Sequence, residues 1–216
     1  MALDLITVRE PRAPAAEAYR TVRTNIQFSS LERQLHTIMV TSSAPDEGKS
    51  TTLANLAVTM AQAEQRVIVV DCDLRRPSLH TIFGVSNDSG LTTTLVDKAA
   101  TIALQPTGVE GLRILPTGPL PPQPADVLGS KHMAALIERL KGEADVVLFD
   151  APPITAASDA AVLATRLDGV LLVARSGKTR RDRAREAVQL LQKVNAHIVG
   201  VVLTDARVEK GGYGSY

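Results

Sequence analysis

Short apolar runs alternate with longer amphipathic segments along most of the chain. The runs predict strands at 36–41, 66–71, 112–115, 145–150, 169–174 and 197–203. The segments between them follow a helical repeat and predict helices at 15–28, 50–64, 131–141, 158–166 and 181–195. Several strands, such as VIVV and GVLLVA, are apolar throughout, which indicates burial on both faces of a parallel sheet. The alternation predicts a doubly wound α/β fold, with a mostly parallel sheet and helices on both faces.

The same pattern divides the chain into three parts. Residues 1–14 are mixed in character and contain Pro11 and Pro14, so we interpret them as an N-terminal arm. Residues 15–205 are expected to form one domain, and residues 206–216 a flexible C-terminal tail, because the tail contains three glycines. Open α/β sheets bind ligands at the carboxyl ends of their strands. Candidate chemistry is therefore expected at those strand ends.

Composition excludes several classes of protein. The 216 residues are 44% hydrophobic, which is enough for a substantial core and excludes global disorder. A formal net charge of +1 means that any attraction to nucleic acid or membrane must come from a local patch. Cys72 is the single cysteine, which excludes an internal disulfide and a multi-thiolate metal site and fits a reducing cytosol. The sequence contains no apolar run long enough to span a bilayer and no signal-peptide pattern at its start.

A phosphate-binding loop is the first candidate site. Gly48-Lys49-Ser50 follows the first strong strand and matches the end of a Walker A motif, although Ser43 stands where a glycine is usual. The glycine would let the backbone approach the phosphates, the lysine would reach the β- and γ-phosphates, and the serine would bind Mg²⁺. A chance strand–turn–helix sequence is the alternative. The loop residues expected to hold the nucleotide are Ala44, Pro45, Asp46, Glu47, Gly48, Lys49, Ser50 and Thr51.

Two further strands end in carboxylates at the same edge of the predicted sheet. VIVV runs into Asp71 and Asp73, and VVLF runs into Asp150. A carboxylate at the end of a buried strand is costly unless a cation or hydrogen-bond donors meet it. Mg²⁺ prefers few protein carboxylates together with phosphates and water. We therefore expect Ser50, Asp71 and Asp150 to converge on one Mg²⁺, whereas a cap or turn is the alternative for each acid alone.

Together these motifs resemble the cytoplasmic bacterial tyrosine kinases (BY-kinases) of capsule and exopolysaccharide synthesis, which are P-loop relatives of the ParA and MinD ATPases. The resemblance covers roughly residues 15–216 and rests on the segments SSAPDEGKST, VIVVDCDLRRP, VVLFDAPP and LPPQPADVL. It includes an E-x-x-R-x-x-R oligomerisation motif formed by Glu17, Arg20 and Arg23. It also includes two tyrosines in the last four residues, Tyr213 and Tyr216.

The resemblance implies a P-loop NTPase fold and ATP-dependent autophosphorylation of the two tail tyrosines, with ATP and Mg²⁺ as cofactors. It implies that Lys49 holds the phosphates, that Ser50 and Asp150 position Mg²⁺, and that Asp71 and Asp73 assist the metal and accept the tyrosine proton. Of these two acids, Asp73 is the favoured base.

The resemblance also implies partners and a location. The implied partners are further copies of the chain in a ring-like homo-oligomer, a membrane adaptor of the polysaccharide co-polymerase type, and a cognate tyrosine phosphatase. Within the ring, phosphoryl transfer would occur in trans. No nucleic acid is expected. The chain is expected in the cytoplasm, recruited to the inner face of the membrane through a partner, either as a stand-alone kinase or as part of a longer fusion.

Three features keep alternatives open. The family commonly places Asn at the end of the last strand to contact adenine, where this chain has Thr204, which lacks the paired amide geometry. Glu17, Arg20 and Arg23 would lie along one stripe of a helix, here called the Glu17 stripe. Such a stripe is typical of an oligomer contact but also of an intrahelical ion pair. A basic run fits either an anion-docking surface or a solvated face, and it favours the rival hypothesis of a ParA/MinD-type partitioning ATPase. Its residues are Lys178, Arg180, Arg181, Arg183 and Arg185. A nucleotide-gated assembly factor without catalysis is the second rival.

Overall fold

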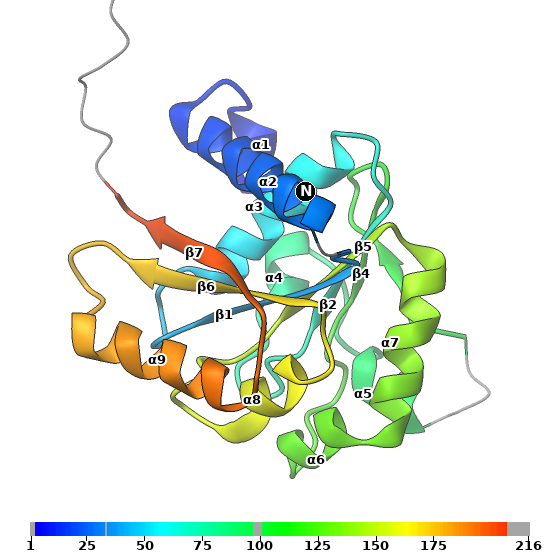
Figure 1. The fold of residues 1–216 in the computed structure, drawn as a ribbon. Helices are drawn as coiled ribbons and strands as arrows, with labels where there is room; N and C mark the ends of the chain where they lie inside the picture. Colours follow the sequence, from blue (N-terminus) through cyan, green and yellow to red (C-terminus); the bar gives the residue numbers. More distant parts are fainter. Residues whose placement is uncertain (1–2, 33, 97–100, 207–216) are drawn as a thin grey trace, which may run out of the picture.

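A twisted, mostly parallel sheet forms the centre of the molecule (Figure 1). The structure is a computed structural model and describes residues 3–32, 34–96 and 101–206. Over these residues the strand order is β3-β4-β2-β5-β1-β6-β7, and only the β3–β4 pair is antiparallel. The strands are β1 (Thr37–Ser42), β2 (Val67–Asp71), β3 (Gln105–Pro106), β4 (Leu112–Leu115), β5 (Val146–Asp150), β6 (Gly169–Arg175) and β7 (Ile198–Thr204).

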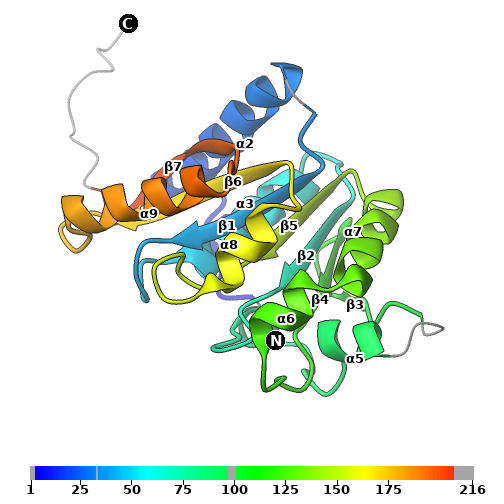
Figure 2. The ribbon, with the colours of Figure 1, turned by 60° about the horizontal axis from the view of Figure 1, so that its bottom comes forward.

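Helices cover both faces of this sheet. On one face lie α1 (Ile6–Arg9), α2 (Pro14–Glu32), α3 (Lys49–Ala61) and α4 (Leu79–Phe83). On the other lie α5 (Leu91–Val96), α6 (Pro124–Gly129), α7 (Lys131–Glu143), α8 (Ser158–Ala164) and α9 (Arg181–Lys193). In Figure 2, α7, α8 and α9 lie across the near face of the sheet.

The two faces bury separate hydrophobic clusters, because successive strand residues point to opposite sides. In β2, Val67 and Val69 pack with α3, whereas Ile68 and Val70 pack with the cluster of α5–α9. Every residue of β1, β2 and β5 is buried. The predicted doubly wound α/β fold is therefore confirmed, and the apolar strand runs are explained by burial on both faces.

The described residues of the predicted N-terminal arm, 3–14, pack against the domain. Leu5 and Thr7 are fully buried. The hydroxyl of Thr7 donates to Asn55 Oδ1 at 2.9 Å, which joins this segment to α3. The apolar residues of the segment are too few to give a periodic signal, so its packing could not be inferred from the sequence pattern. The segment then leads directly into α2, which is longer at both ends than the predicted helix 15–28.

The strand order determines which loops meet. Since β1 lies between β5 and β6, and β2 lies on the other side of β5, the loops that follow β1, β2 and β5 share one edge of the sheet. The strand register also aligns the two acids at this edge. Asp71 of β2 pairs with Asp150 of β5, and Asp150 pairs with Val40 of β1. The fold therefore brings the sequence motifs of three separate segments together.

Candidate functional site

The phosphate loop connects β1 to α3 and turns sharply at Gly48. Gly48 has φ of 87°, in the left-handed region that a residue with a Cβ atom adopts only with strain, and it caps α3. A Cβ added at this position would lie 3.4 Å from Thr204 Cγ2, so the loop also passes close to the end of β7. The N-terminus of α3 is thereby directed at the space beside the loop, where backbone N–H groups favour an anion.

Glu47 braces this loop from within. Its carboxylate is buried and accepts from the backbone N–H groups of Ser43 at 2.9 Å and Ala44 at 3.0 Å. It also accepts from the hydroxyl of Ser43 at 2.8 Å and from that of Thr179 at 2.5 Å. Glu47 was expected among the nucleotide-binding residues, but its side chain is engaged within the chain. The residue nonetheless borders one of the two cavities described below.

Lys49 gathers the acids of the neighbouring strand ends. Its Nζ atom lies 2.9 Å from Asp73 Oδ2, 3.4 Å from Asp150 Oδ1 and 3.1 Å from the hydroxyl of Ser50. The Ser50 hydroxyl donates to Asp150 Oδ2 at 2.5 Å. Burial by itself lowers the pKa of Lys49, but the charges of Asp150 and Asp73 outweigh it and raise that pKa. The lysine therefore stays charged among the acids.

The acids differ in how they are held. Asp71 accepts from the backbone N–H groups of Ser78 and Leu79, each at 3.0 Å, and from that of Asp73 at 3.2 Å. Burial, together with the charge of Asp150, raises the pKa of Asp71 to about 8 in spite of these bonds. Burial also raises the pKa of Asp150, while the charge of Lys49 opposes that change. Additional positive charge beside them would therefore favour the ionised forms of Asp71 and Asp150.

The donor set suits magnesium in part. Ser50 and Asp150 present a hydroxyl and a carboxylate oxygen side by side, as Mg²⁺ prefers when phosphates and water supply the remaining ligands. Asp71 is less suited to direct ligation, because both of its oxygens accept backbone N–H groups. Within residues 3–206, as far as the structure describes them, no group of three or more His, Cys, Asp and Glu side chains is arranged as a metal site. A metal here would depend on ligands from a phosphate.

Two cavities open on either side of the phosphate loop. The smaller, of about 350 Å³, lies beside Lys49, Ser50 and Asp73 and is bordered by Arg75, Arg76, Pro152 and Pro153. The larger, of about 850 Å³, lies between α2, the start of α3 and β7. Gly48 and Thr51 border both cavities. An extended ligand with phosphates at the loop could therefore reach into both.

Thr204 borders the larger cavity but uses its donor within the chain. Its hydroxyl donates to the backbone carbonyl of Glu47 at 2.8 Å. The hydroxyl donor is therefore already used and is not available to an adenine ring. The contact also joins the end of β7 to the phosphate loop. Thr204 would therefore contribute to nucleotide binding by holding that loop in place.

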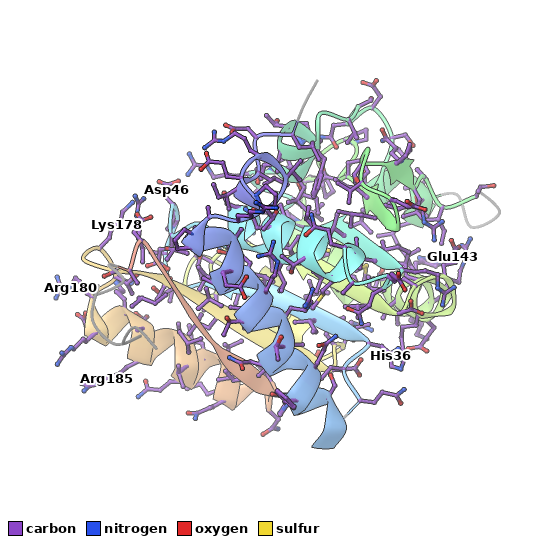
Figure 3. The ribbon with its side chains drawn as sticks, turned by 90° about the horizontal axis from the view of Figure 1, so that it is seen from above. His36, Asp46, Glu143, Lys178, Arg180 and Arg185 are labelled. Carbon is purple, nitrogen blue, oxygen red and sulfur yellow. The ribbon has the colours of Figure 1, made fainter. Side chains whose placement is uncertain are left out.

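The end of β6 and the loop that follows it, residues 175–180, also brace the phosphate loop. Arg175 Nη1 and Lys178 Nζ donate to the backbone carbonyl of Asp46, at 3.2 and 3.5 Å. Figure 3 shows Lys178 beside Asp46, with Arg180 and Arg185 farther along the same side and Glu143 on the opposite side. Two arginines of the predicted basic run are engaged with neighbouring acids, Arg180 with Asp182 and Arg183 with Glu186. Part of the positive charge is thus neutralised locally.

The Glu17 stripe makes contacts within the chain. Glu17 Oε2 lies 2.7 Å from Arg20 Nη1 in an exposed pair on α2. Arg23 Nη1 donates to the backbone carbonyl of Thr59 on α3 at 2.8 Å. These contacts match the alternative of an intrahelical pair for Glu17 and Arg20, and they leave the predicted oligomer contact untested. Tyr213 and Tyr216 lie outside the described residues.

Sequence reasoning missed a second ion pair at this edge. Arg75 and Arg76 were noticed only as part of the DLRRP segment, and Asp159 was not singled out. In the structure Asp159 is buried and binds Arg75, 84 residues away. A single aspartate at the predicted start of a helix is typical of a helix cap, so the sequence contained no signal for this role.

Comparisons with known proteins agree with this geometry. Residues 33–207 match a family model described as ParA, NUBPL iron-transfer P-loop NTPase. The chain is 41% identical to tyrosine-protein kinase YwqD of Bacillus subtilis, over 100% of this chain and 92% of that protein. It is 33% identical to putative tyrosine-protein kinase CapB of Staphylococcus aureus, over 93% and 89% of the two chains. The kinase domain of Escherichia coli tyrosine kinase ETK superposes with a TM-score of 0.87, at 33% identity, over 97% of this chain and 84% of that one.

Proposed function

The chain belongs to the bacterial tyrosine-protein kinases within the P-loop NTPases, and we propose that it transfers the γ-phosphate of ATP to tyrosines in its own C-terminal tail. The observation that carries this proposal is the single cluster of Lys49, Ser50, Asp73 and Asp150 beside the phosphate loop. Phosphoryl transfer depends mainly on positioning and charge neutralisation, and this cluster supplies both.

In the proposed reaction the triphosphate lies against the backbone of residues 44–51. Lys49 exchanges its carboxylate partners for the phosphates and neutralises their charge. Ser50 and Asp150 would hold Mg²⁺, which as a bound ion neutralises the charge that develops on the transferring group. Asp71 stays within its backbone hydrogen bonds and adds negative charge near the metal.

The acceptor would enter the smaller cavity, beside Asp73. A tyrosine hydroxyl has an ordinary pKa of about 10, so it keeps its proton until transfer begins. As the bond from the tyrosine oxygen to the γ-phosphorus forms and the bond to the β-phosphate oxygen breaks, Asp73 takes the proton. The products are phosphotyrosine and ADP. Asp73 is the favoured base because its Oδ2 atom pairs with Lys49 and accepts no backbone N–H group of the described residues, whereas both oxygens of Asp71 accept such groups.

The tail is long enough to reach an active site. From Asp205 to Tyr216 an extended chain spans at most about 40 Å, which reaches the edge of the same molecule or the site of a neighbour. We favour transfer in trans within a ring-like homo-oligomer, to which Glu17, Arg20 and Arg23 would contribute. In such a ring, a heterologous contact places one tail beside the next active site.

The proposed setting is capsule or exopolysaccharide synthesis and export, which the kinase would regulate. The proposed partners are a membrane adaptor of the polysaccharide co-polymerase type and a tyrosine phosphatase that reverses the modification. No helix of the described residues is long and apolar enough to cross a membrane. In this proposal the adaptor recruits the kinase to the inner face of the membrane.

Incubation with γ-labelled ATP and Mg²⁺ tests the reaction, with Lys49→Met as the inactive variant. We expect label on peptides containing Tyr213 or Tyr216 and its loss, by at least about 100-fold, in the variant. Lys141→Met is the matched control, because Lys141 forms an exposed pair on α7 far from the loop, and it should label normally.

Two other outcomes contradict the kinase proposal. Release of free phosphate with no labelled protein supports a ParA/MinD-type ATPase with a positioning role. Nucleotide binding without turnover supports an assembly factor.

A further inference from the structure

An ion pair with a buried carboxylate lies at the carboxyl edge of the sheet, outside the Lys49 cluster. The carboxylate of Asp159, in the first turn of α8, is 0% exposed and accepts from Arg75 Nε at 2.6 Å and from Nη2 at 3.1 Å. Two parallel bonds from one guanidinium fix its plane and direction. Since Arg75 belongs to the loop after β2, which carries Asp73, and Asp159 lies in the first turn of α8, the pair joins that loop to the start of α8.

Stability alone is a poor explanation for this pair. Removing a carboxylate from water is expensive, and an apolar pair of similar size is often as stable. The Arg75 side chain is 49% exposed, so solvent also weakens the attraction. A pair that contributes little to stability but has a fixed geometry is more useful for holding a backbone segment in place.

The segment that it holds carries Asp73. The backbone N–H groups of Arg75 and Arg76 donate to Asp73 Oδ1, at 3.4 and 3.0 Å. The other oxygen of Asp73 lies 2.9 Å from Lys49 Nζ. Asp71 is instead anchored by Ser78 and Leu79 beyond this turn. Movement of the Arg75 backbone would therefore displace Asp73 more than Asp71.

We propose that Arg75 and Asp159 are a positioning pair, which holds the loop after β2 so that the Asp73 carboxylate stays directed at the acceptor hydroxyl. This inference rests on the proposed function. Arg75 borders the cavity proposed for the acceptor, but its guanidinium is bound to Asp159, so the pair acts through the backbone around Asp73. Its loss therefore slows transfer but leaves the nucleotide contacts of the phosphate loop intact.

The test compares Asp159→Asn with a control from the same two strands. Arg66 and Asp145 form an ion pair of 2.6 Å just before β2 and β5, at the opposite edge of the sheet, so Asp145→Asn removes a similar bridge far from the site. Tail labelling is measured at saturating ATP, together with the ATP concentration that gives half the maximal rate, at a temperature where melting curves show each variant folded. For Asp159→Asn we expect the saturated rate to fall about 10- to 100-fold while half-saturation changes less than about twofold. For Asp145→Asn both quantities should stay within about twofold.

A rescue series separates positioning from general damage. Arg75→Lys keeps the positive charge but loses the two parallel N–H donors of the guanidinium, so it should give an intermediate rate of labelling. The double variant Arg75→Lys/Asp159→Asn should be no slower than Asp159→Asn, because both changes break one contact. The inference is wrong if Asp159→Asn slows labelling no more than Asp145→Asn, or if it mainly raises the half-saturating ATP concentration. If the wild-type protein labels no tyrosine, the proposed function fails, and the same comparison of saturated rates is made on ATP hydrolysis to decide on the pair.

Discussion

Substitution of Glu47 tests the bracing of the phosphate loop. Its Oε2 atom accepts from the backbone N–H groups of Ser43 and Ala44, and its Oε1 atom accepts from the hydroxyls of Ser43 and Thr179. Glu47→Gln can place its oxygen on the two backbone groups and its amide on the two hydroxyls, which can rotate to accept. Glu47→Met has a similar volume but offers no acceptor to either backbone group.

The expected magnitudes follow from this difference. In Glu47→Gln every partner stays hydrogen-bonded and only the charge is lost, so we expect a loss of about 1 kcal/mol in the free energy of unfolding. In Glu47→Met two backbone N–H groups lose their acceptor, at about 1–3 kcal/mol each, so we expect a loss of about 2–6 kcal/mol. That is a large part of the total stability of an ordinary domain, about 5–15 kcal/mol.

Urea denaturation of the three proteins, followed by circular dichroism, measures these differences, and calorimetric titration with Mg-ATP measures affinity. We expect Glu47→Met, compared under conditions where it is folded, to bind Mg-ATP at least about 10-fold more weakly, because the loop loses its preformed shape. Equal stabilities for the two variants, or unchanged affinity in Glu47→Met, would refute the idea that Glu47 braces the loop from within.

Two further predictions concern the same loop and its acids. Gly48→Ala should weaken Mg-ATP binding at least about 10-fold in titration, because alanine is strained at φ of 87°. The control Gly142→Ala, at an open position in α7, should bind Mg-ATP normally. Normal binding by Gly48→Ala would contradict the proposed close approach of phosphate. Since burial raises the pKa of Asp71 to about 8, the folded protein binds this proton more tightly than the unfolded chain, whose Asp pKa is about 3.9. Stability relative to Asp71→Asn should therefore fall as pH rises from about 4 to about 8, by at most about 1.4 kcal/mol per unit, and melting curves that show the opposite sign would contradict it.

Much of the fold could be predicted because its strands and long helices have strong periodic signals. The buried strands contain runs of Val, Ile and Leu, and their observed bounds differ from the predicted ones by a residue or so. The elements that were missed are short, such as α4 with five residues and β3 with two. Segments of this length carry too few residues for a period, and their conformation depends on contacts made by the rest of the chain.

The part of the candidate site that lies at the ends of the strands could be predicted from the sequence. Asp71, Asp73 and Asp150 stand at or just after the ends of apolar runs, and the fold brings Asp73 and Asp150 to Lys49 and sets Asp71 beside Asp150. The sequence could not indicate that Glu47 turns inward, because loop conformation decides it. Nor could it pair Arg75 with Asp159, since an ion pair between distant segments leaves no periodic trace.

The hydrogen bond from Thr179 to Glu47 has a practical consequence for work on this protein. Residues 176–180 form an exposed turn between β6 and α9, which would ordinarily be chosen for an affinity tag or a fluorophore. Here a label would disturb the hydrogen bond from Thr179 to the Glu47 carboxylate, which holds the phosphate loop in its shape. A lost nucleotide signal in such a reporter would then record damage from the labelling and not a property of the enzyme.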